Sequence, residues 1–258
     1  MVDSIPDAFW LVTVKKRKRY IVIWNSSNEE DEKEVLPSKN DLKAKVQKET
    51  GGKREMITWQ EWCYIIGGYL SGSILYSYLL PKALKGIDIT AESPDGNPGT
   101  ANAFTCAGIP IGILVLCMEL LKGYLPVHLA LREVNPARWS FALILAAPVF
   151  GHACPFLQPQ KGGKAIAVSF GVLLGLVPFW LPVLSLAALY LIFSLVIVID
   201  PHFYRSVCTF VLFSVSIFCR VSMTGISVGC CLISAVVIRN HYARYRGEQM
   251  SVRLALHR

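Results

Sequence analysis

The sequence predicts an all-α fold, a polytopic membrane bundle of about seven transmembrane helices, and three observations support this prediction. Apolar residues make up 53% of the 258 positions and charged residues only 17%, against roughly a quarter in soluble domains. The mean hydropathy is +0.44, which excludes an intrinsically disordered chain. Beyond Met56, uncharged apolar runs are long enough to cross a bilayer as helices.

The charges are concentrated at the N-terminus. Residues 1–55 carry 12 basic and 10 acidic side chains, half of all the charged residues in the chain. We therefore divide the sequence into a charged leader at 1–55, a membrane domain at 56–250 and a basic tail at 251–258. Because Met56 lies directly before the first apolar run, we interpret the leader as an over-extended gene start, and a basic accessory arm is the alternative.

Three apolar runs come first, at 62–81, 103–118 and 139–157. A helical span needs about 20 residues, and these runs meet or approach that length. Backbone groups in lipid must be hydrogen-bonded within the protein, so each run is predicted to be a helix rather than a strand.

The longest uncharged run, 165–199, is predicted to form two helices. Its 35 residues would make a single helix of roughly 52 Å, well beyond the thickness of a bilayer core. Pro178 and Pro182 favour a tight turn between the two halves. Further spans are expected at 202–219 and 221–238, which brings the count to seven, with five as the lower bound.

The distribution of lysine and arginine orients the bundle, since both are enriched in cytoplasmic loops. If Met56 lies outside, the inner segments carry ten basic residues and the outer segments carry four. We therefore expect the bundle to begin outside the membrane and the C-terminus to be cytoplasmic.

Polar and glycine-rich segments at span ends are the expected places for function in such a protein. The loop 88–102 leads into a helix whose N–H groups can bind an anion, and a solvated capping loop is the alternative. Near residue 152, Gly151-His152 is followed by Lys161-Gly162-Gly163-Lys164, in which two lysines and an accessible backbone suit a phosphate. A packing histidine and topology-fixing lysines are the alternatives there.

Other polar groups favour structural roles. Glu119 and Lys122 lie three residues apart on one helical face and are expected to form an ion pair. The eight cysteines include no Cys-x-x-Cys pair, so no metal site is predicted and they are interpreted as apolar filler. The segment 239–248 is predicted either to hold a phosphate or lipid headgroup or to fix the topology.

Together, these segments resemble the bacterial acyl-phosphate:glycerol-3-phosphate acyltransferase family over about residues 57–250. The matching segments are Gly72-Ser73-Ile74, Asp88-Ile89 with residues 96–102, Glu119-x-x-Lys122-Gly123, and Gly151-His152-x-x-Pro155 with residues 161–164. The last of these is the most specific.

The chain also departs from the family pattern. Asp95 stands where the family has Ser, and Thr90 and Thr105 stand where it has basic residues. The terminal His-Arg-x-Asn motif is recognisable only as His241 with Arg244 nearby. These departures indicate a divergent branch.

The resemblance implies an enzyme that transfers an acyl group from acyl phosphate to the 1-hydroxyl of sn-glycerol 3-phosphate, giving lysophosphatidate for phospholipid biosynthesis. It implies a multi-pass protein of the bacterial cell membrane whose active site faces the cytoplasm. The expected partners are the two substrates and membrane lipids, with no cofactor, metal or nucleic acid.

On this basis, His152 and Lys164 are the expected catalytic residues. His152 is expected to act as a base or to orient one, and a substrate phosphate can also take the hydroxyl proton. Asp95 is expected to bind glycerol hydroxyls, because its charge repels a phosphate. The expected substrate-binding residues are Ser73, Asp95, Gly96, Asn97, Gly99, Asn102, Lys161, Gly162, Gly163, His241 and Arg244.

Two other functions stay open. An inactive family member that serves as a membrane scaffold is favoured by the departures at Thr90 and Asp95. A membrane transporter or lipid-binding protein would favour internal repeats and ionisable groups near the membrane midplane. The polar clusters of this sequence lie at span ends instead, so this function is the weaker alternative.

Overall fold

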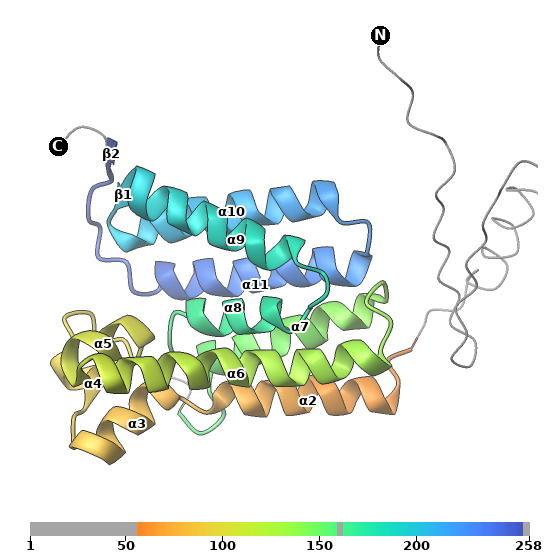
Figure 1. Cartoon of the computed structure of the whole chain (residues 1–258), viewed down its shortest axis with the longest axis horizontal. Coiled ribbons are helices and arrows are strands. Elements are labelled where there is room, and N and C mark those ends of the chain that lie inside the picture. The colour runs from red at the N-terminus through yellow and green to blue at the C-terminus, as the bar shows by residue number, and fades with distance from the viewer. Residues whose placement is uncertain (1–55, 159–161, 255–258) are drawn as a thin grey trace, which may run out of the picture. The chain divides into compact units, whose positions relative to one another are not determined.

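The computed structural model describes residues 56–158 and 162–254. The leader at 1–55, Lys161 and the end of the predicted basic tail lie outside the described residues, so the interpretation of the leader stays a prediction. The described part is mostly helical, as the sequence predicts (Figure 1).

The first predicted span is divided into two helices. A capping box of Thr58 and Glu61 starts α2 (Trp59–Ser73), and α3 (Tyr76–Lys85) follows after the extended residue Ile74. Two short helices come next, α4 (Ile89–Glu92) and α5 (Thr100–Ala107).

The second span is much longer than predicted. The predicted run ended before Glu119, because a charge inside a bilayer is costly, whereas α6 (Ile109–Glu133) continues for 25 residues through Glu119 and Lys122. These two side chains are buried and form an ion pair, so neither charge faces lipid alone.

The second half of the chain follows the prediction except at one place. The elements are α7 (Trp139–Ala153), α8 (Ile166–Leu174), α9 (Leu181–Leu191), η2 (Ile192–Val196), β1 (Ile197–Asp200), α10 (His202–Arg220), α11 (Thr224–Tyr242) and β2 (Ser251–Leu254). The turn between α8 and α9 lies at the two prolines, as predicted, but the end of the run at 165–199 is not an α-helix. There, the π-helical turn η2 leads into the strand β1, which pairs antiparallel with β2.

The longer helices lie side by side and run alternately in opposite directions (Figure 1). As a result, α3, α4, α5 and the β1–β2 ribbon gather at one end of the bundle, together with the C-terminal end of α11 (Figure 1). We call this the polar end, because the predicted loop 88–102 and the described residues 151–158 and 162–164 reach it.

α7 lies at the centre of the core and contacts both α2 and α11. Most of its side chains are buried, among them Phe141, Ile144 and Leu145. Phe210 and Phe213 of α10 are fully buried in the same core. Because lipid tails are as apolar as these side chains, the close packing of the helices, rather than removal from water, stabilises their contacts within a membrane.

The outer surface of the helices is also apolar. Large hydrophobic side chains such as Ile66, Leu121, Leu184 and Phe218 are exposed. Four described stretches are long and apolar enough to cross a membrane, namely Trp59–Lys85, Ile109–Glu133, His202–Arg220 and Thr224–Tyr242. Two further apolar helices, Trp139–Ala153 and Leu181–Val196, are shorter, so the count of seven spans stays a prediction.

Glycines allow α2 and α7 to approach each other closely. Gly68 and Gly72, four residues apart on α2, both face Pro148 of α7. A Cβ atom at Gly72 would overlap the Pro148 carbonyl, and one at Gly151 would overlap the Tyr69 carbonyl. Small residues at this spacing are typical of closely packed membrane helices.

The contact predicts a contrast between two glycines of α2. Gly72→Ala is expected to lower the free energy of unfolding by about 1–3 kcal/mol, because the added methyl group forces the helices apart. Gly67→Ala is the matched control, since a Cβ atom there has no neighbour within 4 Å. Denaturant unfolding in detergent measures both, and equal stability of the two variants would contradict the close contact.

Candidate functional site

The loop between α4 and α5 is held together by Asp95. Its Oδ1 atom accepts hydrogen bonds from the backbone N–H of Asn97 (3.2 Å) and from the side-chain amide of Asn102 (2.7 Å). The Asn102 amide also donates to the Asn97 carbonyl at 2.8 Å. Gly96 adopts a left-handed conformation with φ of 61°, which glycine adopts at little cost. The loop is therefore a preformed structure rather than a loose connection.

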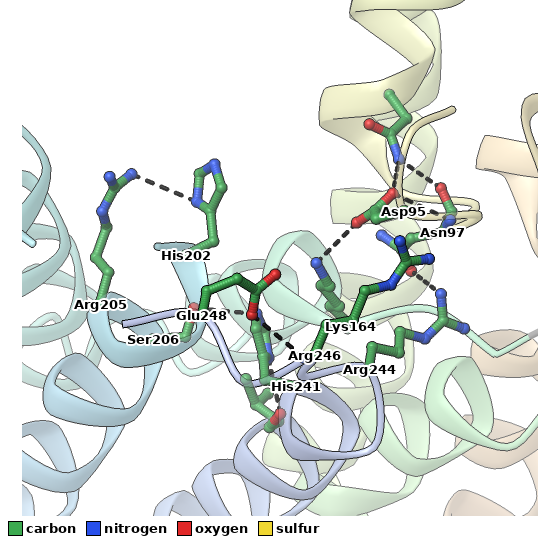
Figure 2. A network of polar contacts seen from close by, with 12 residues as sticks. Asp95, Asn97, Lys164, His202, Arg205, Ser206, His241, Arg244, Arg246 and Glu248 are labelled. Carbon is green, nitrogen blue, oxygen red and sulfur yellow. Dashed lines mark hydrogen bonds and ion pairs between the residues drawn. The ribbon is translucent and has the colours of Figure 1, made fainter. Parts of the chain in front are cut away.

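Two cations reach this loop from other parts of the chain. Lys164, just before α8, places its Nζ atom 2.8 Å from Asp95 Oδ2. Arg244, after α11, donates to the side-chain oxygen of Asn97 at 2.9 Å and to the Gly162 carbonyl. Figure 2 shows Lys164 pointing toward Asp95, and Arg244 toward Asn97.

Asp95 is ionised near neutral pH. Its partial burial alone would raise the pKa of the carboxyl, but hydrogen bonds from Lys164 and Asn102 outweigh this, so the pKa lies below its ordinary value. The charge of Lys164 is consequently compensated by a neighbouring carboxylate.

These residues surround a cavity of about 340 Å³ at the polar end. Its polar lining comes from the loop 95–102, Lys164, the three histidines at 152, 202 and 241, and Tyr190. Leu116, Ile166 and Phe170 form an apolar wall. The cavity is therefore suited to a molecule with an anionic part and an apolar part.

A buried ionic cluster adjoins the cavity. Glu119 and Lys122 form the expected ion pair, with 2.7 Å between Nζ and Oε2, and both side chains are almost fully buried. The Nδ1 atom of His152 lies 2.9 Å from Lys122 Nζ and 3.1 Å from Glu119 Oε2. The spacing of Glu119 and Lys122 predicts their pairing, whereas their contact with His152 is visible only in the fold.

The two glycines at 162 and 163 are required by packing. A Cβ atom at Gly162 would overlap the Ala153 carbonyl, and one at Gly163 would overlap the His152 ring. The Gly163 N–H donates to the His152 carbonyl at 3.0 Å, so it is not available to a ligand. Ala165 then adopts a left-handed φ of 64°, which is uncommon for a residue with a side chain.

The C-terminal end of α11 supplies two further buried polar residues. His241 donates from Nδ1 to the Val237 carbonyl, and its Nε2 atom lies 3.0 Å from the hydroxyl of Ser206. Asn240 donates from its amide to the carbonyls of Ala153 (3.3 Å) and Gly163 (2.8 Å). Asn240 thereby joins α11 to the two segments that flank His152 and Lys164.

The structure brings most of the expected site residues together. Seven line the cavity, namely Asp95, Asn97, Gly99, Asn102, His152, Lys164 and His241. Gly96, Gly162, Gly163 and Arg244 lie directly behind this lining. Ser73 is not among the lining residues; its hydroxyl donates to the Tyr69 carbonyl and accepts from the Phe156 N–H. Lys161 lies outside the described residues.

The sequence reasoning missed several residues of this region. His202 and Tyr190 line the cavity, while Ser206 and Asn240 are buried beside it. Nothing in their local sequence distinguishes them, except that His202 follows Asp200 and Pro201 at the start of α10. In the described part of the chain, no three His, Cys, Asp or Glu side chains are grouped to hold a metal ion.

A protein-family comparison identifies one family. The family described as glycerol-3-phosphate acyltransferase matches residues 62–247, which covers most of the chain. The glycerol-3-phosphate acyltransferase 2 of Thermotoga maritima is 38% identical over 112 residues, 43% of this chain and 56% of that protein. The enzyme of Trichlorobacter lovleyi is 36% identical over 180 residues, 70% of this chain and 89% of that protein. This chain spans 56–59% of the length of the first three curated relatives.

Solved structures give the same result. The glycerol 3-phosphate form of PlsY, described as an integral membrane glycerol 3-phosphate acyltransferase, matches with a TM-score of 0.63 and 26% identity. Its lysophosphatidic acid form matches with a TM-score of 0.60 and 25% identity. Both matches cover 71% of this chain and 89% of the solved chain.

The two bonds of Asn240 predict a stability effect. Asn240→Asp keeps the shape of the side chain but removes the donor, so the two buried carbonyls lose their partner and face a carboxylate. The free energy of unfolding is expected to fall by about 1–3 kcal/mol. Arg220→Ala, at an exposed position at the end of α10, is the control and is expected to stay within about 0.5 kcal/mol of the parent. Denaturant titration in detergent tests this, and an unchanged Asn240→Asp midpoint would contradict it.

Proposed function

The chain belongs to the glycerol-3-phosphate acyltransferase family, and from this premise we propose that it transfers an acyl group from acyl phosphate to the 1-hydroxyl of sn-glycerol 3-phosphate. The products are lysophosphatidate and inorganic phosphate. The observation that carries the proposal is the cavity at the polar end, where Lys164 and three histidines face an apolar wall.

The cavity suits both substrates. Each has a phosphate that needs cationic and N–H partners, and Lys164, the Arg244 guanidinium behind the loop and the cavity histidines are the groups of this kind. Phe170, Ile166 and Leu116 provide an apolar surface for the first part of an acyl chain. The rest of the chain would extend between helices into the membrane.

The reaction needs little covalent help from the protein. The 1-hydroxyl oxygen attacks the carbonyl carbon of the acyl phosphate, the bond from that carbon to the phosphate oxygen breaks, and inorganic phosphate leaves. The hydroxyl proton passes to His152 or to an oxygen of a substrate phosphate. Correct positioning of two bound reactants can supply about 7–11 kcal/mol, and cationic groups around developing charge add to this.

Lys164 and Asp95 have complementary roles in this proposal. The substrate phosphate approaches Lys164, and the Asp95 carboxylate, which Lys164 and Asn102 hold in place, accepts hydrogen bonds from glycerol hydroxyls. Lys161 and the Gly162 N–H are further phosphate ligands in the proposal. The Gly163 N–H is left out because the His152 carbonyl occupies it.

The proposed topology has seven spans, with the start of α2 outside and the polar end in the cytoplasm of a bacterial cell. The alternating direction of the helices supports it, because α2 begins at the end opposite the one where α11 finishes (Figure 1). Basic residues on the polar-end elements support it too, among them Lys82, Lys85, Arg205 and Arg246. The phosphate substrates would then reach the cavity from the cytoplasm.

An inactive family member is the second candidate, and the ion pair between Asp95 and Lys164 favours it. Incubation of the purified protein with radiolabelled glycerol 3-phosphate and synthetic acyl phosphate separates the two functions. Formation of lysophosphatidate supports the enzyme, and its absence from correctly folded protein supports the inactive member. Complementation of a conditional acyltransferase mutant repeats the test in cells.

The proposal predicts the effect of removing the Lys164 ammonium. Lys164→Ala is expected to lower the acyl transfer rate by about 10²–10³-fold, the usual cost of losing one group that stabilises developing charge. Lys82→Ala is the control, because Lys82 is an exposed lysine of α3 that does not line the cavity, and its rate should equal that of the wild type. A full rate in Lys164→Ala would contradict the site assignment.

The role of Asp95 predicts a change in ligand preference. Asp95→Asn frees the Lys164 ammonium, so inorganic phosphate is expected to bind more tightly. Glycerol 3-phosphate should gain less, because it loses the charged acceptor for its hydroxyls, and such a hydrogen bond contributes about 1.5–3 kcal/mol. Calorimetric titration in detergent should therefore show the ratio of the two dissociation constants changing by about tenfold or more. An equal gain for both ligands would show that Asp95 does not contact the hydroxyls.

A further inference from the structure

Among the residues that the structure describes, hydrogen bonds hold the His152 ring at its Nδ1 side alone. Its Nδ1 atom faces the buried Lys122 ammonium at 2.9 Å. Lys122 also donates to the Ile74 carbonyl at 2.6 Å and forms the 2.7 Å ion pair with Glu119. The side chains of Lys122 and Glu119 are 2% and 1% exposed, and that of His152 is 6% exposed, so water does not substitute for these contacts.

The chemistry of the ammonium determines where the imidazole proton lies. An ammonium group has three donors and no acceptor, so the Nδ1 atom must accept the hydrogen bond and cannot carry a proton. The nearby Glu119 Oε2 atom lies 2.7 Å from Lys122 Nζ and 3.1 Å from Nδ1. The three ammonium hydrogens thus match three acceptors, namely the Ile74 carbonyl, Glu119 Oε2 and Nδ1, and a proton on Nδ1 would face the ammonium. A neutral His152 therefore carries its proton on Nε2. Transfer of a proton from Lys122 to the ring would give an imidazolium, which has the Nε2–H group as well.

The Nε2 edge of the ring faces the candidate site. It lies against the backbone of Gly163, where an added Cβ atom would overlap Nε2. His152 also lines the cavity that contains Asp95, Asn102 and Lys164. None of the described residues forms a hydrogen bond with Nε2, so this N–H group is available to a ligand.

We infer that Lys122, together with Glu119, is a positioning residue that keeps a proton on Nε2 of His152, so that His152 donates a hydrogen bond to an anionic oxygen of the substrates. The inference rests on the proposed function, and it assigns His152 the role of a donor rather than a base. The hydroxyl proton of glycerol 3-phosphate must then pass to a substrate phosphate oxygen. Lys122 and Glu119 act only through His152 and do not touch the substrates.

Nitrogen NMR of the full chain tests the position of the proton without any turnover. The protein is labelled with ¹⁵N-histidine in detergent micelles, and the His152 signals among the five histidines are assigned by their loss in His152→Gln. We expect a proton on Nε2 and none on Nδ1. A spectrum with an unprotonated Nε2 would overturn the inference.

Lys122→Met tests the positioning role. Without the ammonium, the Glu119 carboxylate, 3.1 Å from Nδ1, is its closest charged neighbour in the described part of the chain. Nδ1 is therefore expected to gain a proton and to donate a hydrogen bond to Glu119. Lys122→Arg, which keeps a cationic donor, is the matched control and should restore the unprotonated Nδ1. An Nδ1 atom that stays unprotonated in Lys122→Met would rule out Lys122 as the group that positions the proton.

Two substitutions that place an amide at position 152 distinguish a hydrogen-bond donor from a base. A glutamine amide reaches the place of the imidazole Nε2 atom and an asparagine amide only that of Nδ1, and neither takes up a proton at neutral pH. His152→Gln is expected to retain kcat within about tenfold of the wild type, and His152→Asn to lose about 10²–10³-fold, the usual cost of one lost donor. An equally large loss in both folded variants would identify His152 as a base and overturn the inference.

The NMR spectrum and the acyl transfer assay of the wild-type protein together separate the inference from the proposed function. An inactive wild-type protein with a protonated Nε2 would contradict the proposed acyl transfer and support the positioning of His152. An active wild-type protein with an unprotonated Nε2 would support the proposed acyl transfer and contradict the positioning of His152.

Discussion

The buried ion pair of Glu119 and Lys122 is the interaction on which the arrangement of the polar end depends. A charge inside a membrane protein is tolerated only where it is paired and hydrogen-bonded. This pair has partners on α3, on α7 and at the break between α2 and α3. The break at Ile74 leaves backbone groups without helical partners, and the pair forms hydrogen bonds with them. Lys122 donates to the Ile74 carbonyl, and the Ser77 N–H donates to Glu119 at 3.2 Å. The pair therefore stabilises the interruption between α2 and α3.

The same pair is connected through Ser77 to the loop that forms part of the cavity wall. Ser77, whose backbone binds Glu119, donates from its hydroxyl to the Pro98 carbonyl. Pro98 belongs to the loop that Asp95 and Asn102 hold together. On the other side of the pair, His152 lies near the end of α7. The carbonyl of the next residue, Ala153, accepts a hydrogen bond from the Asn240 amide. Loop and histidine, 50 residues apart in the chain, thus face one cavity because both are attached to one ionic cluster.

The sequence predicted the elements that follow from hydrophobicity and proline positions. It did not predict the elements whose bounds depend on contacts between distant parts of the chain. The turn between α8 and α9 was predictable because Pro178 and Pro182 interrupt a run too long for one helix. The length of α6 was not, because the compensation of Glu119 and Lys122 depends partly on His152, 30 residues away. The strand at Ile197–Asp200 was missed for a similar reason, since its partner Ser251–Leu254 lies in a polar tail. Among the site residues, the clustered ones were predicted, whereas single residues such as His202 and Asn240 reach the cavity region only through folding.

The divergence from the family pattern also has a structural explanation. Thr90 and Thr105, which stand in place of basic residues, do not line the cavity. The Thr90 side chain bonds Asp88, and Thr105 is exposed on α5. A cation nevertheless reaches the loop from the opposite wall, because Arg244 bridges Asn97 and Gly162. It stands three residues after His241, where the family motif has Asn. Coulombic attraction depends on where a charge lies and not on which helix carries it. An arginine after α11 can therefore supply the positive charge of a basic residue that the first loop lacks. Asp95 forms its ion pair with Lys164, whereas Arg244 bonds Asn97 and Gly162.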